Sequence, residues 1–144
     1  MAAPSTGFAL EVRRTFNARR ERVFAAWTSA EEIQRWSAPG DMKVPTAVVD
    51  LKVGGKYRIV MEAPDGTQHP AYGRYEVIEP PSKLVYTWGW ESGLETDTLV
   101  TVEFHERGAS TEVVLKQERL TSAESREKHT QGWNGCLDKL ATLY

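Results

Sequence analysis

Apolar and polar residues alternate along most of this 144-residue chain. In the first patterned segment the even positions Phe8, Leu10, Val12 and Phe16 are apolar, which is typical of a strand with one buried face. Turn residues separate further alternating segments, and connections this short predict antiparallel neighbours. These further predicted strands are Val44–Leu51, Lys56–Glu62, Ala71–Ile78, Leu84–Trp90, Thr98–His105 and Thr111–Arg119.

Two short helices are predicted between the first strand and the second. Asn17 is the expected N-cap of the first helix, whose apolar face carries Val23, Phe24 and Trp27. Ser29 and Glu32 form a capping-box pattern that opens the second, which the dipeptide Pro39-Gly40 ends. The apolar face of this second helix carries Ile33 and Trp36.

A long helix is predicted at the C-terminus, where the apolar spacing changes from two to about three and a half residues. Thr121 and Glu124 form the capping box at its start. Helical spacing places His129 and Arg126 on the same side as the apolar stripe, towards the sheet. The stripe itself consists of Trp133, Cys136, Leu137, Leu140, Leu143 and Tyr144.

These elements together predict an α+β fold, in which a curved antiparallel sheet of six to seven strands wraps around the long C-terminal helix. Residues 8–144 form one domain, and residues 1–7 are expected to be a flexible N-terminus because they are small and polar. Hydrophobic residues make up 40% of the chain and charged residues 26%, which is typical of a globular protein.

The net charge and the absence of long apolar runs exclude several classes of partner. The formal net charge of -2 offers no broad positive field, so we expect no nucleic acid partner. No apolar run approaches the roughly 18 residues that a membrane span requires, and the first residues lack the features of a signal peptide. Cys136 is the single cysteine, which excludes an intramolecular disulfide and fits a cytoplasmic protein.

The predicted inner face of the sheet is wide and rich in aromatic residues. One helix about 10 Å across covers only part of such a face, so an apolar cavity beside the helix is expected, holding a small apolar ligand. The alternation also places Gly73, Tyr75, Val77 and Trp90 on this face. The residues predicted to line the cavity are Trp36, Tyr57, Ile59, Met61, Tyr75, Tyr86, Trp88, Val102, Phe104, His129 and Trp133. The alternative is that the tryptophans are simply core.

Few residues of the sequence are candidates for catalysis or metal binding. His129 could bind a ligand or transfer a proton at the polar end of the cavity, with Arg126 beside it. The histidines and Cys136 are too scattered in the sequence for a metal site, and we expect neither a metal nor a cofactor. No catalytic motif is recognisable, which favours a binding protein over an enzyme without excluding catalysis. The acids Glu91, Glu95 and Asp97 share one loop, and we expect a solvated charged tip there.

The order of elements resembles that of the START-like (SRPBCC) superfamily with its helix-grip fold. Within it, the chain is most similar to the family named after the C-terminal domain of the activator of Hsp90 ATPase. The resemblance runs from about Phe8 to Tyr144. The segments that carry it are Val23–Thr28 with Trp36, Asp50–Gly55, Gly73–Pro81, Leu84–Trp88, Thr101–Phe104, Thr111–Leu115 and Gly132-Trp133 with Leu137 and Leu140.

The resemblance implies a cavity between the sheet and the C-terminal helix, on a scaffold that serves several functions. It favours a binding protein for a small apolar, aromatic or lipid-like molecule. Two alternatives follow from relatives: a stress-related regulator of Hsp90, and an enzyme of the cyclase or hydrolase kind that uses the same cavity. Where many relatives carry a histidine near the end of the last strand, this chain has Gln117. Neither the ligand nor the oligomeric state follows from the sequence.

Overall fold

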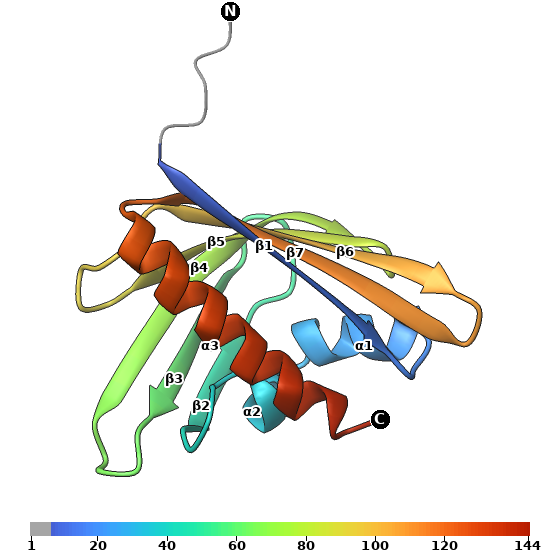
Figure 1. Cartoon of the computed structure of the whole chain (residues 1–144), viewed down its shortest axis with the longest axis horizontal. Helices are drawn as coiled ribbons and strands as arrows, with labels where there is room; N and C mark the ends of the chain where they lie inside the picture. The colour runs from blue at the N-terminus through green and yellow to red at the C-terminus, as the bar shows by residue number, and fades with distance from the viewer. Residues whose placement is uncertain (1–6) are drawn as a thin grey trace, which may run out of the picture.

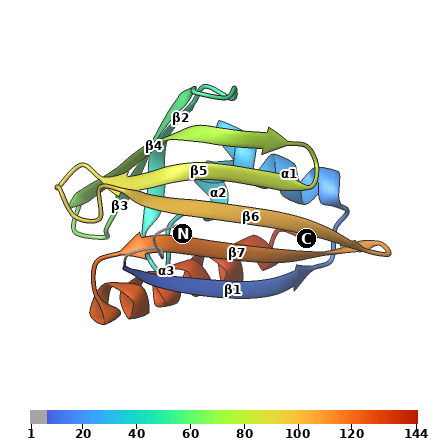
Figure 2. The ribbon, with the colours of Figure 1, turned by 90° about the horizontal axis from the view of Figure 1, so that it is seen from above.

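Seven strands form one antiparallel sheet in the computed structural model, which describes residues 7–144. The sheet order is β1-β7-β6-β5-β4-β3-β2, so the first strand lies beside the last, and Figure 2 shows β5, β6, β7 and β1 running side by side. Of the predicted flexible segment 1–7, all but Gly7 lies outside the described residues. The strands are β1 (Phe8–Phe16), β2 (Lys43–Val49), β3 (Lys56–Glu62), β4 (Gln68–Glu79), β5 (Lys83–Trp90), β6 (Thr98–Arg107) and β7 (Ser110–Leu120).

The predicted α+β helix-grip fold is confirmed, with α1 (Arg20–Thr28), α2 (Ala30–Trp36) and the long α3 (Ala123–Ala141) at the predicted places. Each predicted strand is present, and all bounds but one agree to within two residues. The largest difference is at β4, which begins at Gln68 rather than Ala71. The alternation before Ala71 is interrupted by polar residues and Pro70, so the periodicity alone did not reveal these first three residues.

The predicted helix caps are correct in one case and wrong in two. Ser29 caps α2, because its side chain accepts a hydrogen bond from the backbone N–H of Glu32. Asn17 does not cap α1, because Asn17 and Ala18 form a bend after β1 and the helix starts after Arg19 without a side-chain cap. The N-cap of α3 is Ser122 rather than Thr121, and its side chain accepts from Ser125 N–H.

The helix α3 crosses in front of the sheet, with α1 and α2 beside its C-terminal half (Figure 1). It packs mainly against β1 and α2, and more lightly against β7, while α2 packs on β2. The buried residues of α3 are Trp133, Cys136, Leu137 and Leu140, all from the predicted stripe. Because the helix leans towards β1 and β7, the inner faces of β3, β4 and β5 beside its N-terminal half are left partly uncovered.

The inner face of the sheet has one change of register that the alternation did not predict. Between Tyr75 and Val77 the pairing of β4 with β5 shifts, as in a β-bulge. Ile78 therefore packs against the core in place of Val77, which the alternation had placed on the inner face. Within residues 7–144, no helix is long and apolar enough to cross a membrane.

Candidate ligand cavity

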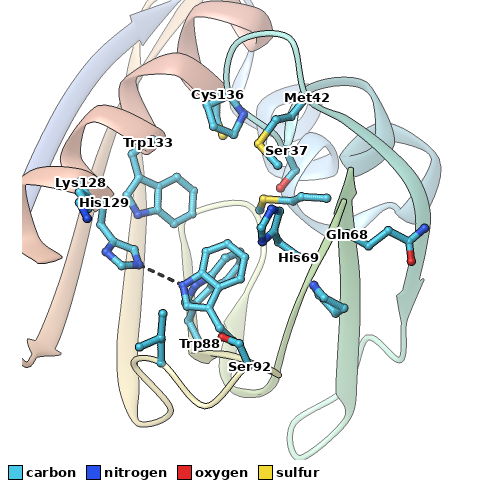
Figure 3. A pocket seen from close by; sticks show the side chains of 16 residues that line it. Ser37, Met42, Gln68, His69, Trp88, Ser92, Lys128, His129, Trp133 and Cys136 are labelled. Carbon is cyan, nitrogen blue, oxygen red and sulfur yellow. Dashed lines mark hydrogen bonds between the residues drawn. The ribbon is translucent and has the colours of Figure 1, made fainter. Parts of the chain in front are cut away.

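A cavity of about 380 Å³ lies where α3 leaves the inner face of the sheet uncovered. Its walls come from the middle of α3, the ends of β3, β4 and β5, and the segments that follow α2 and β5 (Figure 3). The lining residues are Ser37, Pro39, Met42, Met61, Gln68, His69, Pro70, Trp88, Trp90, Ser92, Leu94, Lys128, His129, Gly132, Trp133 and Cys136.

Three tryptophans and two methionines contribute to the cavity wall, which is largely apolar. The ring centroid of Trp88 lies 5.8 Å from that of Trp133 and 5.6 Å from that of Trp90. Burial raises the pKa of the Cys136 thiol to about 12, although Lys139 lowers it slightly, so the thiol stays protonated and apolar near neutral pH. The cavity therefore presents an apolar surface with a few polar groups at its edge.

A void of about 20 Å³ lies deeper, beyond Trp88 and Trp133, which line both spaces. Three tyrosines line it, and burial raises the pKa of each, so their hydroxyl groups are uncharged. The Tyr57 hydroxyl donates a hydrogen bond to the backbone carbonyl of Thr87, 2.5 Å away. This space is large enough for about one water molecule, so it is an extension of the core rather than a ligand site.

The structure distributes the predicted lining residues over three places. Met61, Trp88, His129 and Trp133 line the large cavity. Five others line only the deep void: Trp36, Tyr57, Ile59, Tyr75 and Tyr86. Val102 and Phe104 line neither space, and both lie in the packed core.

The reason for the position of Val102 and Phe104 is helix α1, which covers this part of β6. The Phe104 ring packs against the rings of Phe24 and Trp27, with centroids 5.2 and 5.5 Å apart. The alternation gave the inner face of β6 correctly, but it could not show that a helix fills the space above it.

Arg126 does not reach the cavity. Its side chain is exposed, and its guanidinium carbon lies 5.2 Å from the ring centroid of Phe8, at the start of β1. Because α3 leans over β1, the position seven residues before Trp133 faces the sheet edge rather than the space between sheet and helix. The prediction that Arg126 accompanies His129 at the polar end of the cavity is therefore wrong.

His69 is a cavity residue that the sequence analysis missed. It pairs with Met61 across β3 and β4, and both line the cavity. Period-two spacing backwards from the buried Ala71 would have placed His69 on the inner face, but the predicted strand began at Ala71 itself. Trp90 was placed on the inner face by the alternation and also lines the cavity.

His129 forms hydrogen bonds through both ring nitrogens. The indole N–H of Trp90 donates to its Nε2 atom at 3.2 Å, as the dashed line in Figure 3 marks. Its Nδ1 atom lies 2.8 Å from the backbone carbonyl oxygen of Ser125. An indole N–H can only donate and a carbonyl can only accept, so these contacts assign the neutral tautomer with the proton on Nδ1.

Glu95, expected at a solvated loop tip, is buried against the start of α3 with 9% of its surface exposed. Its carboxylate accepts hydrogen bonds from the Thr121 N–H at 3.0 Å and from the Ser125 hydroxyl at 2.5 Å. Burial raises the pKa of Glu95, but these hydrogen bonds outweigh that effect, and the net pKa lies below its ordinary value. The prediction of a charged loop tip is correct for Glu91 and Asp97, which are exposed, and wrong for Glu95.

The backbone of Glu95 is also strained, which fits a side chain that tertiary contacts hold in place. Its φ angle is 49°, in the left-handed region that non-glycine residues rarely adopt. The hydrogen bonds of the carboxylate compensate for this strain and hold the loop between β5 and β6 against α3.

In the described part of the chain, no group of three or more histidine, cysteine or acidic residues is placed to hold a metal ion.

Comparisons with known proteins agree with this architecture. The chain matches the family described as activator of Hsp90 ATPase homolog 1-like protein over residues 17–144. A solved protein from Chromobacterium violaceum is 26% identical, with a TM-score of 0.87 over 94% of this chain and 95% of that one. The AHSA1-like protein from Aeromonas hydrophila is also 26% identical, with a TM-score of 0.79 over 94% of this chain and 90% of that one.

The sheet that grips a C-terminal helix, with a cavity beside that helix, defines a protein of the START-like class. The family match begins just after β1 and extends to Tyr144. The chain belongs to the activator of Hsp90 ATPase homolog 1-like family. A search of curated proteins gave no match.

Proposed function

We propose that this protein binds a small apolar, aromatic or lipid-like molecule in the cavity between β3–β5 and α3. The observation that carries the proposal is the cavity itself, about 380 Å³ in volume, with a largely apolar surface to which three tryptophans and two methionines contribute. Ligand sites in proteins are typically clefts of roughly 300–1,000 Å³ with apolar walls and a few placed polar groups. The volume is near the lower end of this range and favours a compact ligand.

Exposed apolar side chains at the rim of the cavity also support ligand binding. Leu94, in the loop that follows β5, has 68% of its surface exposed, and Trp90 beside it is only half-buried. A molecule in the cavity would remove apolar surface of both side chains from water, which contributes roughly 25 cal/mol for each Å² buried. Apolar surface that is exposed at a concave site is typical of a binding surface.

Gly132 provides a specific test of the proposal. It lies on the cavity wall, and a Cβ atom added there would have no neighbour within 4 Å. The substitution Gly132→Leu should therefore place a side chain in the cavity without disturbing its surroundings. The control, Asn134→Leu, adds the same side chain to an exposed position of α3.

The measurement is the melting temperature of the wild type and both variants in the presence of compact aromatic and short-chain lipid compounds. Compounds that bind the cavity should raise the melting temperature of the wild type and of Asn134→Leu through linkage of binding to folding. They should leave folded Gly132→Leu unchanged. The proposal fails if no compound stabilises the wild type, or if Gly132→Leu is stabilised equally.

A further inference from the structure

Trp90 and His129 form a donor–acceptor pair across the cavity wall, one residue on β5 and the other on α3. Both line the cavity, and both are half-buried rather than enclosed in the core. The Nε1 atom of Trp90 and the Nε2 atom of His129 lie 3.2 Å apart, at the long end of the usual range for hydrogen bonds. Because both residues line the cavity, a ligand group can reach this polar pair.

The direction of this hydrogen bond is fixed by the surroundings of His129. The Ser125 carbonyl accepts from Nδ1, as described above, which leaves Nε2 with a free lone pair for Trp90. The Ser125 hydroxyl lies 3.3 Å from Nδ1, but its hydrogen is directed to the carboxylate of Glu95. Since that hydroxyl is already a donor to Glu95, it can only accept from Nδ1, and the same tautomer follows.

We infer that this pair selects ligands that carry a hydroxyl group, an inference that rests on the proposed function. A hydroxyl placed between the two side chains accepts from the Trp90 N–H and donates to His129 Nε2, so both groups remain satisfied. An ether or carbonyl oxygen can only accept, and it leaves Nε2 without a donor. A methyl group does neither, so the Trp90–His129 hydrogen bond stays closed and the methyl group gains no polar contact there.

The other lining residues indicate the chemical class of the ligand that carries this hydroxyl group. The Trp88 ring centroid lies 5.6 Å from that of Trp90 and 5.8 Å from that of Trp133, so the three indoles form a continuous aromatic wall that a flat apolar ring can contact. Lys128 is the single lysine or arginine among the lining residues, and its solvent-exposed ammonium group lies 3.1 Å from the Glu124 carboxylate, so the lining offers an anionic ligand no buried cationic partner. The ligand class is thus an uncharged, compact aromatic alcohol or phenol.

Three probes of nearly equal size compare a hydroxyl, an ether and a methyl group on the same ring system. They are 2-naphthol, 2-methoxynaphthalene and 2-methylnaphthalene. Their affinities would be measured by calorimetric titration against the wild type and His129→Phe, which keeps a ring and removes the acceptor. His105→Phe makes the same change on β6, where His105 pairs with Glu103 away from the cavity.

The wild type and His105→Phe should bind 2-naphthol about three- to tenfold more tightly than either other probe, the effect of one neutral hydrogen bond. In His129→Phe the preference for the hydroxyl over the ether should disappear, because both oxygen atoms can still accept from the Trp90 N–H and neither finds an acceptor at position 129. A 15N-labelled wild-type sample gives a readout that needs no variant, since 2-naphthol should shift the His129 Nε2 resonance more than 2-methylnaphthalene does.

The outcomes distinguish this inference from the proposed function. Equal binding of the three probes to the wild type, or a hydroxyl preference that persists in His129→Phe, would overturn the hydroxyl selection and leave the apolar binding site intact. Absence of binding by all three probes would count against both.

Discussion

Gln117 is a polar side chain in the least exposed part of the core, with 0% of its surface accessible. Its Oε1 atom accepts from the Trp133 indole at 2.9 Å, and its Nε2 atom donates to the Thr98 hydroxyl at 3.1 Å. Thr98 in turn donates to the backbone carbonyl of Trp88 at 2.6 Å. Gln117 thus connects Trp133 with the strand of Trp88, two side chains of the cavity wall, and buried groups of this kind are expensive to leave unpaired.

The substitution Gln117→Leu keeps a similar volume but leaves the Trp133 N–H without its acceptor. We expect the free energy of unfolding to fall by about 1–3 kcal/mol, the cost of an unsatisfied buried donor. Urea denaturation measures this change. Lys116→Leu, on the exposed face of the same strand, is the control and should change stability by less than about 0.5 kcal/mol. An equal loss in both variants would show that the hydrogen bonds of Gln117 are not the cause.

At the scale of elements, α3 carries two glycines with opposite surroundings. Gly132 faces open space in the cavity, whereas a Cβ atom at Gly135 would lie 2.8 Å from the Cβ of Pro39, in the segment after α2. Gly135 therefore permits the close approach of α3 to that segment, which forms one side of the cavity. The two positions have the same helical context and differ in their neighbours.

Alanine substitution at each position should give opposite results. Gly132→Ala should raise the free energy of unfolding by about 0.5–1 kcal/mol, because alanine reduces the freedom of the unfolded chain and suits a helix. Gly135→Ala should lower stability relative to Gly132→Ala, since Pro39 or the helix must move. Urea denaturation of the two variants tests this. Equal stabilisation of both would contradict the close packing of α3 against Pro39.

At the scale of the whole molecule, Glu95 ties one end of the sheet to the helix that the sheet encloses. The loop between β5 and β6 carries Glu95, whose carboxylate holds Thr121 and Ser125 at the start of α3. Ser125 in turn supports His129 through its carbonyl. This contact joins residues about thirty positions apart and holds the N-terminal half of α3 beside the cavity.

The lowered pKa of Glu95 predicts how stability depends on pH. The folded protein holds this carboxylate ionised at pH values where the unfolded chain, with a pKa near 4.5, takes up a proton. The contribution of Glu95 is therefore fully present above that pKa and is lost as the pH falls through the lower folded value.

The test compares the free energy of unfolding of the wild type and Glu95→Gln from about pH 6 to pH 3. The advantage of the wild type should be constant at the upper end and should shrink on acidification. Asp97→Gln is a control, because Asp97 is in the same loop but solvent-exposed, 3.5 Å from Arg119. A difference between the wild type and Glu95→Gln that does not change with pH would contradict the role of the ionised carboxylate.

The sequence by itself determined the elements and most of their faces. Alternation in strands and spacing in helices are set by local geometry, so they identified the seven strands and three helices that the structure describes in residues 7–144, and the buried stripe of α3. They also placed Met61, Trp88 and Trp133 on the correct faces. The local rule failed at Val77, where a bulge shifts the register, and at Thr121, where Ser122 is the cap.

Only the tertiary structure decided which part of the inner face is a cavity. That depends on where α1 and α3 cross the sheet, which is the sum of many long-range contacts and leaves no periodic signal. For this reason Phe104 is covered by α1, Arg126 reaches Phe8 instead of the cavity, and His69 faces it from the start of β4. Glu95 likewise has an ordinary loop sequence, and only the fold brings it to α3 and to the residues that orient His129.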